Sequence, residues 1–286
     1  MLQSAPMQPF SNLVPDSALI QDAIQLLRTN GGRATAVHLA EHVFQLPGLE
    51  PETAVALVSE LIKDDWRLKV ADGSAEIEFA GEDDERRRLG ETDYVVFDVE
   101  TTGPKMPPGR LLELGACRIQ SGRIVGEFQT LLNPGTTIPP FISRLTGITD
   151  AMVRDSPTFD EVAPDWLRFA DTAVLVAHDA HFDVRFINHE VTLVYPGRRM
   201  FNAYLCTVSL ARRLFPELGF YRLHALAKYF AVPLPNHHRA AADARATAEI
   251  FLHLLALLGS HGVRDISAAR NFKLKTRRSD RAATVN

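Results

Sequence analysis

Apolar side chains recur every three or four residues in three stretches of the first eighty residues, which predicts three amphipathic helices. These helices are expected from Asp16 or Ser17 to Asn30, over Ala34–Val43, and after Pro51. Two short runs of β-forming residues then surround an Asp-Gly pair, which predicts a hairpin. Its strands are Arg67–Val70 and Glu76–Phe79.

Residues 16–80 are therefore expected to form a small helical domain with a hairpin, an arrangement that resembles a winged helix-turn-helix. Such a domain would bind DNA through its third helix. Here that helix carries Glu52 and Glu60 against Lys63, which is a poor match to phosphate. A protein-contact or spacer domain is the favoured interpretation.

The run Tyr94–Val99 is β-branched and aromatic, as in the middle strand of a sheet. Because side chains alternate faces along a strand, Asp98 and Glu100 project from the same face. Two carboxylates on a buried strand are costly unless something neutralises them. The small residues Thr101-Thr102-Gly103 follow, so the pattern favours a site for a hard divalent cation.

Two further strands, Leu111–Ile119 and Ile124–Leu132, are predicted beside the first, and Ala173–Ala177 is a fourth buried strand. The fourth strand leads into a helix whose first turn holds Asp183. An acid at that position also complements the helix dipole, so Asp183 alone has two explanations.

The last long helix is predicted over Arg239–Leu258, because the prolines before it forbid an earlier start. Asp243 lies on the helix stripe that is otherwise apolar. His238 precedes it by five residues and is placed on the entering loop, from which it could swing over Asp243. His237 is assigned no role.

Three acidic segments occur in order along the chain: Asp98 to Gly103, His178 to Asp183, and His238 to Asp243. They are similar to the three motifs of the DEDDh 3′–5′ exonucleases, and within that family to the proofreading epsilon subunits of bacterial DNA polymerase III. The resemblance extends over about residues 94–258. It implies an α/β, RNase H-like fold: a mixed central sheet flanked by helices, with the acids gathered at one end.

The resemblance also implies the roles of the motif residues. Two Mg²⁺ or Mn²⁺ ions would be bound by four metal ligands, and the histidine of the third motif would be the catalytic base. The metal ligands are Asp98, Glu100, Asp183 and Asp243, and the catalytic residue is His238. Six residues would contact the terminal nucleotide or its phosphates. These are Thr101, Thr102, Gly103, Thr146, Ile148 and His178; for His178 a purely structural role is an equal alternative. Asp179 departs from the family, which often has Asn there.

Charge and composition complete the domain description. Residues 1–90 hold 8 Lys and Arg against 15 Asp and Glu, whereas residues 261–286 hold 7 against 2. The expected organisation is a disordered N-terminus (1–15), a small helical domain (16–80), a charged linker (81–93), the exonuclease domain (94–260) and a basic tail (261–286). The tail is either a tether for the phosphate backbone or a disordered end. The two cysteines exclude a disulfide framework.

The sequence thus predicts a cytoplasmic, metal-dependent exonuclease that hydrolyses DNA from a single-stranded or frayed 3′ end to nucleoside 5′-monophosphates, in proofreading or DNA repair. An RNA-trimming exoribonuclease is the alternative within the enzyme class. A winged-helix regulator with a silent nuclease domain is the alternative outside it. A polymerase or another protein is expected as a partner of the acidic N-terminal domain. No apolar run reaches the length of a membrane span.

Overall fold

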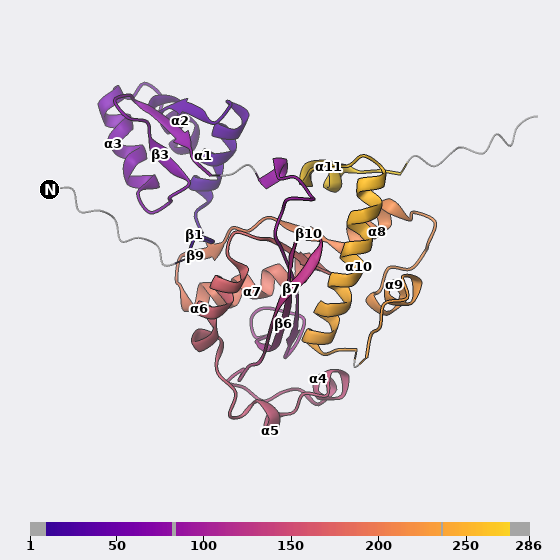
Figure 1. Cartoon of the computed structure of the whole chain (residues 1–286). Helices are drawn as coiled ribbons and strands as arrows, with labels where there is room; N and C mark the ends of the chain where they lie inside the picture. Colours follow the sequence, from indigo (N-terminus) through magenta and orange to yellow (C-terminus); the bar gives the residue numbers. More distant parts are fainter. Residues whose placement is uncertain (1–9, 82–83, 236, 275–286) are drawn as a thin grey trace, which may run out of the picture.

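The computed structural model describes residues 10–81, 84–235 and 237–274 (Figure 1). Its central feature is a five-stranded sheet with strand order β10-β8-β5-β6-β7. The strands are β5 (Tyr94–Thr101), β6 (Leu111–Gln120), β7 (Arg123–Leu131), β8 (Val174–Ala177) and β10 (Tyr204–Cys206). β5, β6 and β7 are antiparallel neighbours, whereas β8 runs parallel to both β5 and β10. The sheet is therefore mixed, as predicted; β10 is the strand that the sequence pattern did not indicate.

Helices cover both faces of this sheet (Figure 1). α6 and α7 lie on one face, and α10 lies on the other with α8 and α9 beyond it. A connection with two short helices, α4 and α5, joins β7 to α6. The bounds are α4 (Pro140–Thr146), α5 (Asp150–Val153), α6 (Phe159–Ala170), α7 (Ala180–Val194), α8 (Thr207–Leu214), α9 (Leu223–Tyr229) and α10 (Ala240–Ser260). None of the described helices is long and apolar enough to cross a membrane.

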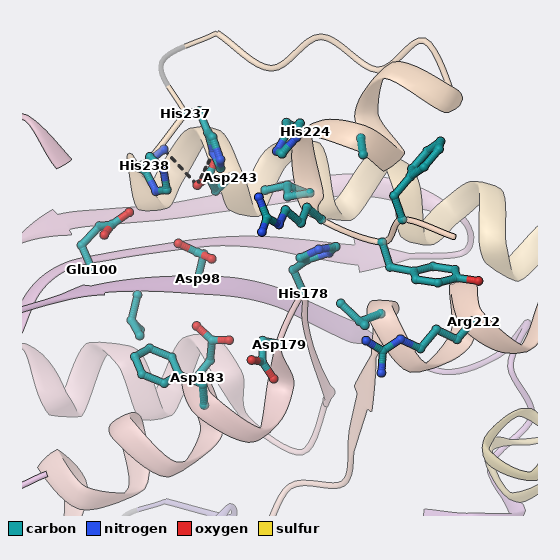
Figure 2. Close-up of a pocket in the computed structure, with 18 of the residues that line it drawn as sticks. Asp98, Glu100, His178, Asp179, Asp183, Arg212, His224, His237, His238 and Asp243 are labelled. Carbon is teal, nitrogen blue, oxygen red and sulfur yellow. Dashed lines mark hydrogen bonds and ion pairs between the residues drawn. The ribbon is translucent and has the colours of Figure 1, made fainter. Parts of the chain in front are cut away.

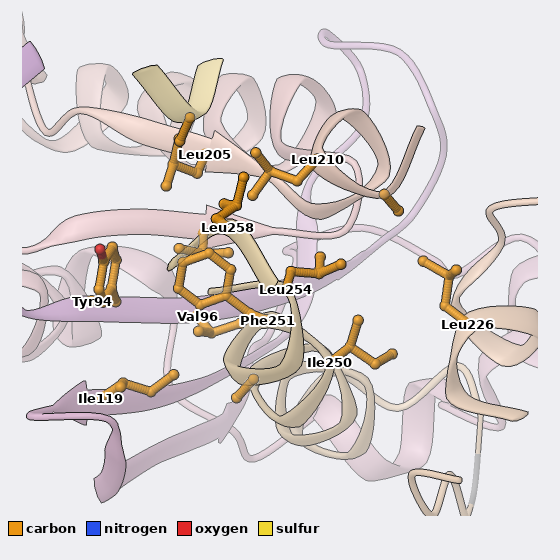
Figure 3. Close-up of a cluster of buried hydrophobic side chains, with 14 of the residues drawn as sticks. Tyr94, Val96, Ile119, Leu205, Leu210, Leu226, Ile250, Phe251, Leu254 and Leu258 are labelled. Carbon is orange, nitrogen blue, oxygen red and sulfur yellow. The ribbon is translucent and has the colours of Figure 1, made fainter. Parts of the chain in front are cut away.

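The alternation of side chains along β5 divides the interior into two cores. Tyr94 and Val96 face α10, where the rings of Tyr94 and Phe251 meet edge to face with centroids 4.9 Å apart (Figure 3). Val95 and Phe97 face α6 and α7 on the other side. Burial of a large apolar side chain such as Phe251 contributes about 1.5–3 kcal/mol, so both helix layers are firmly attached to the sheet. Because the alternation continues beyond Phe97, the next side chain, Asp98, points to the face that α10 covers.

The N-terminal unit has three helices, a hairpin and a separate core. Its elements are α1 (Ala18–Thr29), β2 (Arg33–Thr35), α2 (Ala36–Phe44), α3 (Pro51–Ile62), β3 (Leu68–Val70) and β4 (Glu76–Phe79). The three helices and both hairpin strands lie where the sequence pattern predicts them, and Ser17 caps α1 by accepting a hydrogen bond from the Ile20 N–H. β2 adds a third strand, giving the order β2-β4-β3. Assignment of this unit to the winged-helix class stays a prediction.

Disorder was expected for residues 1–15, and this is wrong for residues 10–15. β1 (Leu13–Pro15) forms an antiparallel pair with β9 (Arg198–Met200), and the Leu13 and Val14 side chains are buried. Residues 1–9 lie outside the described residues. A three-residue strand whose partner is far along the chain leaves no periodic signal, so the sequence pattern could not reveal it.

The expected linker (81–93) and basic tail (261–286) are also not free segments over the part that the structure describes. The tail contains α11 (Ile266–Asn271), whose Ile266 and Ala269 side chains are fully buried. The linker lies against it: Leu89 is buried and its N–H donates to the Arg264 carbonyl at 2.9 Å. A short 3₁₀ turn, η1 (Asp84–Arg86), carries Glu85, which pairs with Arg270. Residues 275–286, which include the remaining tail cations, lie outside the described residues.

Candidate metal centre and active site

Four carboxylates converge on one cavity of about 1130 Å³ at the end of the sheet (Figure 2). Asp98 and Glu100 come from β5, Asp183 from the first turn of α7, and Asp243 from the first turn of α10. Ligand atoms of Asp98, Glu100 and Asp243 lie within 4.8 Å of one another. The sequence motifs, which are up to 145 positions apart, are therefore brought together in space as expected.

Burial and mutual repulsion oppose ionisation of this cluster. Burial first, and then the charges of Asp183, Glu100 and Asp243, hold the pKa of Asp98 well above its usual value. The pKa of Asp183 is also raised, chiefly by burial. Burial and the nearby Asp243 raise the pKa of Glu100 to about 8. Hard divalent cations bind carboxylate oxygens and neutralise such clusters, so the donor set fits Mg²⁺ or Mn²⁺.

The two adjacent histidines take different positions on Asp243. His237 Nδ1 lies 3.1 Å from both carboxylate oxygens of Asp243. His238 instead donates its backbone N–H to Asp243 Oδ2 at 3.1 Å. The two rings stack with centroids 3.9 Å apart, and both line the cavity. His237, which is assigned no role from its sequence pattern, is thus the ring in contact with the Asp243 carboxylate.

The backbone conformation of His238 explains this arrangement. Its φ of 68° places it in the left-handed region, which reverses the chain just before α10 begins. Burial and then the neighbouring His237 lower the pKa of His238 below its usual value, so its ring is neutral near pH 7. Periodicity carries no information about a single left-handed residue, and so could not separate the two rings.

The helices that carry Asp183 and Asp243 are each attached to β6 by a buried glutamate. Glu113 of β6 accepts two hydrogen bonds from the Arg239 guanidinium at 2.9 Å and one from the Ala240 N–H at 3.1 Å. Glu190 of α7 accepts two from Arg110 at 2.8 and 3.0 Å and one from the Leu111 N–H of β6 at 3.3 Å. Planar bidentate pairs of this kind restrict orientation as well as distance. They fix the start of α10 and the body of α7 relative to the strand beside β5.

Comparison with known proteins agrees with this geometry. A family model described as an exonuclease matches residues 95–251, more than half of the chain. The chain belongs to the exonuclease family. The predicted membership of an exonuclease family is confirmed.

Two relatives illustrate the membership, and one solved structure illustrates the fold. The chain is 45% identical over 177 residues to a PolC-type DNA polymerase III of Caldanaerobacter subterraneus, an alignment that covers 62% of this chain and 12% of that protein. It is 41% identical over 170 residues to the DNA polymerase III subunit epsilon of Aquifex aeolicus, covering 59% of this chain and 84% of that one. E. coli Exonuclease I in complex with an oligonucleotide aligns with a TM-score of 0.52 at 18% identity, over 60% of this chain and 42% of the other. That likeness supports the predicted RNase H-like fold of the exonuclease domain.

The nucleotide-contact residues predicted for the exonuclease domain lie in different surroundings. The Thr101 hydroxyl donates to the Gly103 carbonyl at 2.9 Å, and Thr102 Oγ1 accepts from the Arg110 N–H, so these residues form a hydrogen-bonded bend after β5. Thr146 Oγ1 accepts from the Ile148 N–H at 3.1 Å. The Ile148 side chain is fully buried.

His178 is the sixth of these residues, and it lines the exonuclease cavity itself (Figure 2). Its Nδ1 lies 3.0 Å from the Thr207 hydroxyl, and burial lowers its pKa to about 4, so it is neutral at physiological pH. The departing residue Asp179 also lines the cavity and is exposed. All six nucleotide contacts stay predictions.

The exonuclease cavity has a further wall that the sequence analysis missed. It is formed by the end of α8, the loop after it and the start of α9. We call it the basic–aromatic wall, and it consists of Arg212, Phe220, Tyr221, Arg222 and His224. The available signal was a Phe-Tyr-Arg run flanked by an arginine and a histidine between the second and third motifs.

Proposed function

We propose that this chain is a divalent-metal-dependent 3′–5′ DNA exonuclease that releases nucleoside 5′-monophosphates. The observation that carries the proposal is the convergence of Asp98, Glu100, Asp183 and Asp243 on one cavity beside a neutral histidine. The pKa values of Asp98, Glu100 and Asp183 are raised, because the protein supplies too little positive charge near these carboxylates to balance their negative charge.

In this proposal the four carboxylates hold two Mg²⁺ or Mn²⁺ ions. The chemistry that such ions supply is activation of a water molecule and stabilisation of negative charge on the leaving oxygen. His238 accepts the proton that this water loses as its oxygen attacks the phosphorus, and the bond from phosphorus to the 3′ oxygen breaks. A neutral imidazole is the state required for this step, and the lowered pKa of His238 favours it.

Other residues keep these groups in place. His237 contacts the Asp243 carboxylate, and the His238 backbone N–H contacts it as well, so one face of Asp243 is oriented by the loop before α10. The pair of Glu113 and Arg239 fixes the first turn of the same helix. Groups that orient a ligand in this way commonly change metal affinity by about 10–100-fold when removed.

DNA as substrate and a proofreading or repair role are supported by the relatives named DNA polymerase III PolC-type and subunit epsilon. We propose that the chain acts in the cytoplasm. The alignment covers only 12% of the PolC-type relative. In the present chain, the N-terminal unit precedes the exonuclease domain. We propose that this acidic unit contacts a polymerase or another protein rather than DNA, since α3 pairs its Lys63 with Glu60.

The test is hydrolysis of a single-stranded DNA oligonucleotide labelled at its 5′ end. A 3′–5′ exonuclease shortens the labelled strand one nucleotide at a time, so we expect a ladder with Mg²⁺ or Mn²⁺ and none with EDTA. Asp98→Asn should abolish the ladder. Immediate release of a labelled mononucleotide would contradict the direction, and hydrolysis that persists in EDTA would contradict the metal dependence. The same oligonucleotide made as RNA tests the preference for DNA.

A further inference from the structure

The cavity is electrostatically divided. The carboxylates of Asp98, Glu100, Asp183 and Asp243 gather at one end, and Arg212 lies towards the other (Figure 2). Arg222 adds a second guanidinium to the basic–aromatic wall. Within the described residues neither Arg212 nor Arg222 forms an ion pair, and both are exposed to solvent. Two guanidinium groups without carboxylate partners at the rim of a cavity favour an anionic ligand.

The loop that carries this wall is braced from within. The Tyr221 hydroxyl donates to the Phe215 carbonyl at 2.6 Å, and the Arg212 guanidinium lies over the Tyr221 ring, 5.5 Å from its centroid. Gly219 has a φ of 75°, a conformation that turns the chain directly before Phe220. The Phe220 side chain is left 52% exposed at the edge of the cavity. Phe220 thus presents an exposed ring beside two exposed arginines, where a base could stack on it.

The cavity is slightly larger than a typical site for one small molecule. Cavities that bind one small molecule typically measure about 300–1,000 Å³, and this one measures about 1130 Å³. A nucleotide held at the carboxylates would leave the opposite wall free. That wall offers guanidinium groups for phosphates and a ring for a base, which is the combination that binds single-stranded nucleic acid without reading its sequence.

We infer that the basic–aromatic wall is a binding subsite for the single strand just upstream of the terminal nucleotide, with Phe220 stacking on a base and Arg212 and Arg222 contacting phosphates. This inference rests on the proposed function, because the strand enters through the end that the carboxylates process. It assigns to the wall a role in affinity and in strand length, and none in bond cleavage.

Two substrates separate the wall from the carboxylates. The p-nitrophenyl ester of thymidine 5′-monophosphate contains a single nucleotide, so its hydrolysis needs the carboxylate end alone. Oligothymidylates of two, four and eight nucleotides reach progressively further towards the wall. For the unaltered protein we expect KM to fall as the oligonucleotide lengthens.

Phe220→Ala should raise KM for the eight-nucleotide substrate about tenfold, because loss of one stacked base costs about that much in affinity. It should leave hydrolysis of the p-nitrophenyl ester unchanged, because that ester has no upstream nucleotide. Arg222→Ala should weaken binding and make the dependence of log affinity on log salt shallower by about 0.7, the value for one phosphate contact with a single strand. Arg222 precedes α9 without a side-chain cap bond, so its removal spares the helix.

Arg123→Ala is the matched control: Arg123 is also exposed, but it starts β7 and does not line the cavity. It should change neither KM nor the salt dependence. Equal KM values for Phe220→Ala and the unaltered protein at every length would overturn the inference, as would losses that extend equally to the p-nitrophenyl ester. If the unaltered protein hydrolyses neither that ester nor any oligonucleotide with metal present, the proposed function itself fails.

Discussion

The guanidinium of Arg239 and the buried carboxylate of Glu113 form two parallel hydrogen bonds of 2.9 Å, and the same carboxylate accepts the N–H of Ala240. Glu113 has no exposed surface. Removing one partner of a buried ion pair is strongly destabilising, because the other charge is left without compensation. This pair therefore joins the start of α10, and with it Asp243, to the sheet.

Glu113→Gln should lower the free energy of unfolding by about 3 kcal/mol, and it should also reduce kcat because the first turn of α10 loses its anchor. Chemical denaturation and the oligonucleotide assay measure the two effects. Glu127→Gln is the control, because Glu127 pairs with Arg245 on the exposed surface, where such a pair is worth about 0–1 kcal/mol. If the two variants were equally stable, the anchoring role of Glu113 would be refuted.

Gly115→Ala should disturb the site through the backbone. A Cβ at this position would lie 2.3 Å from the Ala241 backbone nitrogen, so the first turn of α10 must move away from β6. We expect weaker metal binding and a lower kcat. Gly126→Ala on β7 is the control, since its nearest neighbour would be an ordinary 3.8 Å contact. Isothermal titration with Mn²⁺ reads the change directly, and unaltered Mn²⁺ affinity in Gly115→Ala would contradict the prediction.

The two histidines should separate in their kinetic effects. His238→Ala should lose about 10²–10⁴-fold in kcat with metal affinity retained, because it removes the proton acceptor. His237→Ala should raise the metal concentration needed for half-maximal activity, by about 10–100-fold, because it removes a contact to Asp243. Metal titrations of activity, combined with direct Mn²⁺ binding, distinguish the two. The reverse assignment, with turnover lost only in His237→Ala, would exchange their roles.

The metal-free protein should become less stable as pH rises from 7 to 9. Glu100 has its pKa raised to about 8 in the folded state and near 4.5 when unfolded. The folded state therefore binds more protons between these values, and stability present below pH 4.5 is lost as pH rises through 8. Each carboxyl still protonated contributes a slope of about 1.4 kcal/mol per pH unit.

Thermal unfolding in EDTA at pH 7, 8 and 9 measures this loss. Both ordinary and lowered histidine pKa values lie below that window, so His178 and His238 do not contribute to it. Mg²⁺ should abolish most of the decline, because bound cations stabilise the ionised carboxylates, and Glu100→Gln should make the decline shallower. A Tm in EDTA that is constant or increases over the window would be incompatible with the raised pKa values.

Two truncations separate structure from charge at the C-terminal end. Ending the chain after Ser260 removes α11 and exposes the surface under Ile266 and Leu89, so Tm should fall sharply. Ending it after Leu274 removes four basic residues and retains α11. If the tail contacts phosphates, this second truncation should weaken DNA binding at low salt without lowering Tm. Equal salt dependence with and without residues 275–286 would refute the tether.

Sequence periodicity predicted elements whose partners are near in the chain or whose apolar pattern is long. The strand of Tyr94, the helix of Asp243 and the three N-terminal helices belong to this group, and their bounds differ from the structure by about two residues. The sequence pattern did not predict β1 and β10, because a three-residue strand is defined by its distant partner rather than by its own residues. The tail was misread for a related reason: the charges of α11 obscure Ile266 and Ala269, which become buried only when Leu89 lies against them.

The residues of the candidate site also fall into those that the local sequence pattern predicts and those that it does not. Asp98 and Glu100 could be paired from alternation alone, whereas the convergence of Asp183 and Asp243 on them required the family resemblance. The separate positions of His237 and His238 depend on one left-handed backbone angle. The basic–aromatic wall depends on how a loop folds back over a cavity, and single-residue chemistry does not reveal that.

The N-terminal unit is attached to the exonuclease domain on both sides. β1 before it pairs with β9, Leu89 after it is hydrogen-bonded to Arg264, and between them the Trp66 ring meets Phe201 edge to face. A unit joined through one linker can turn about that linker, whereas the contacts at both ends together with the one at Trp66 oppose such a turn. A protein that binds the N-terminal unit would therefore hold the four carboxylates at a defined orientation and distance from itself. Its binding would orient the exonuclease domain as well as recruit it.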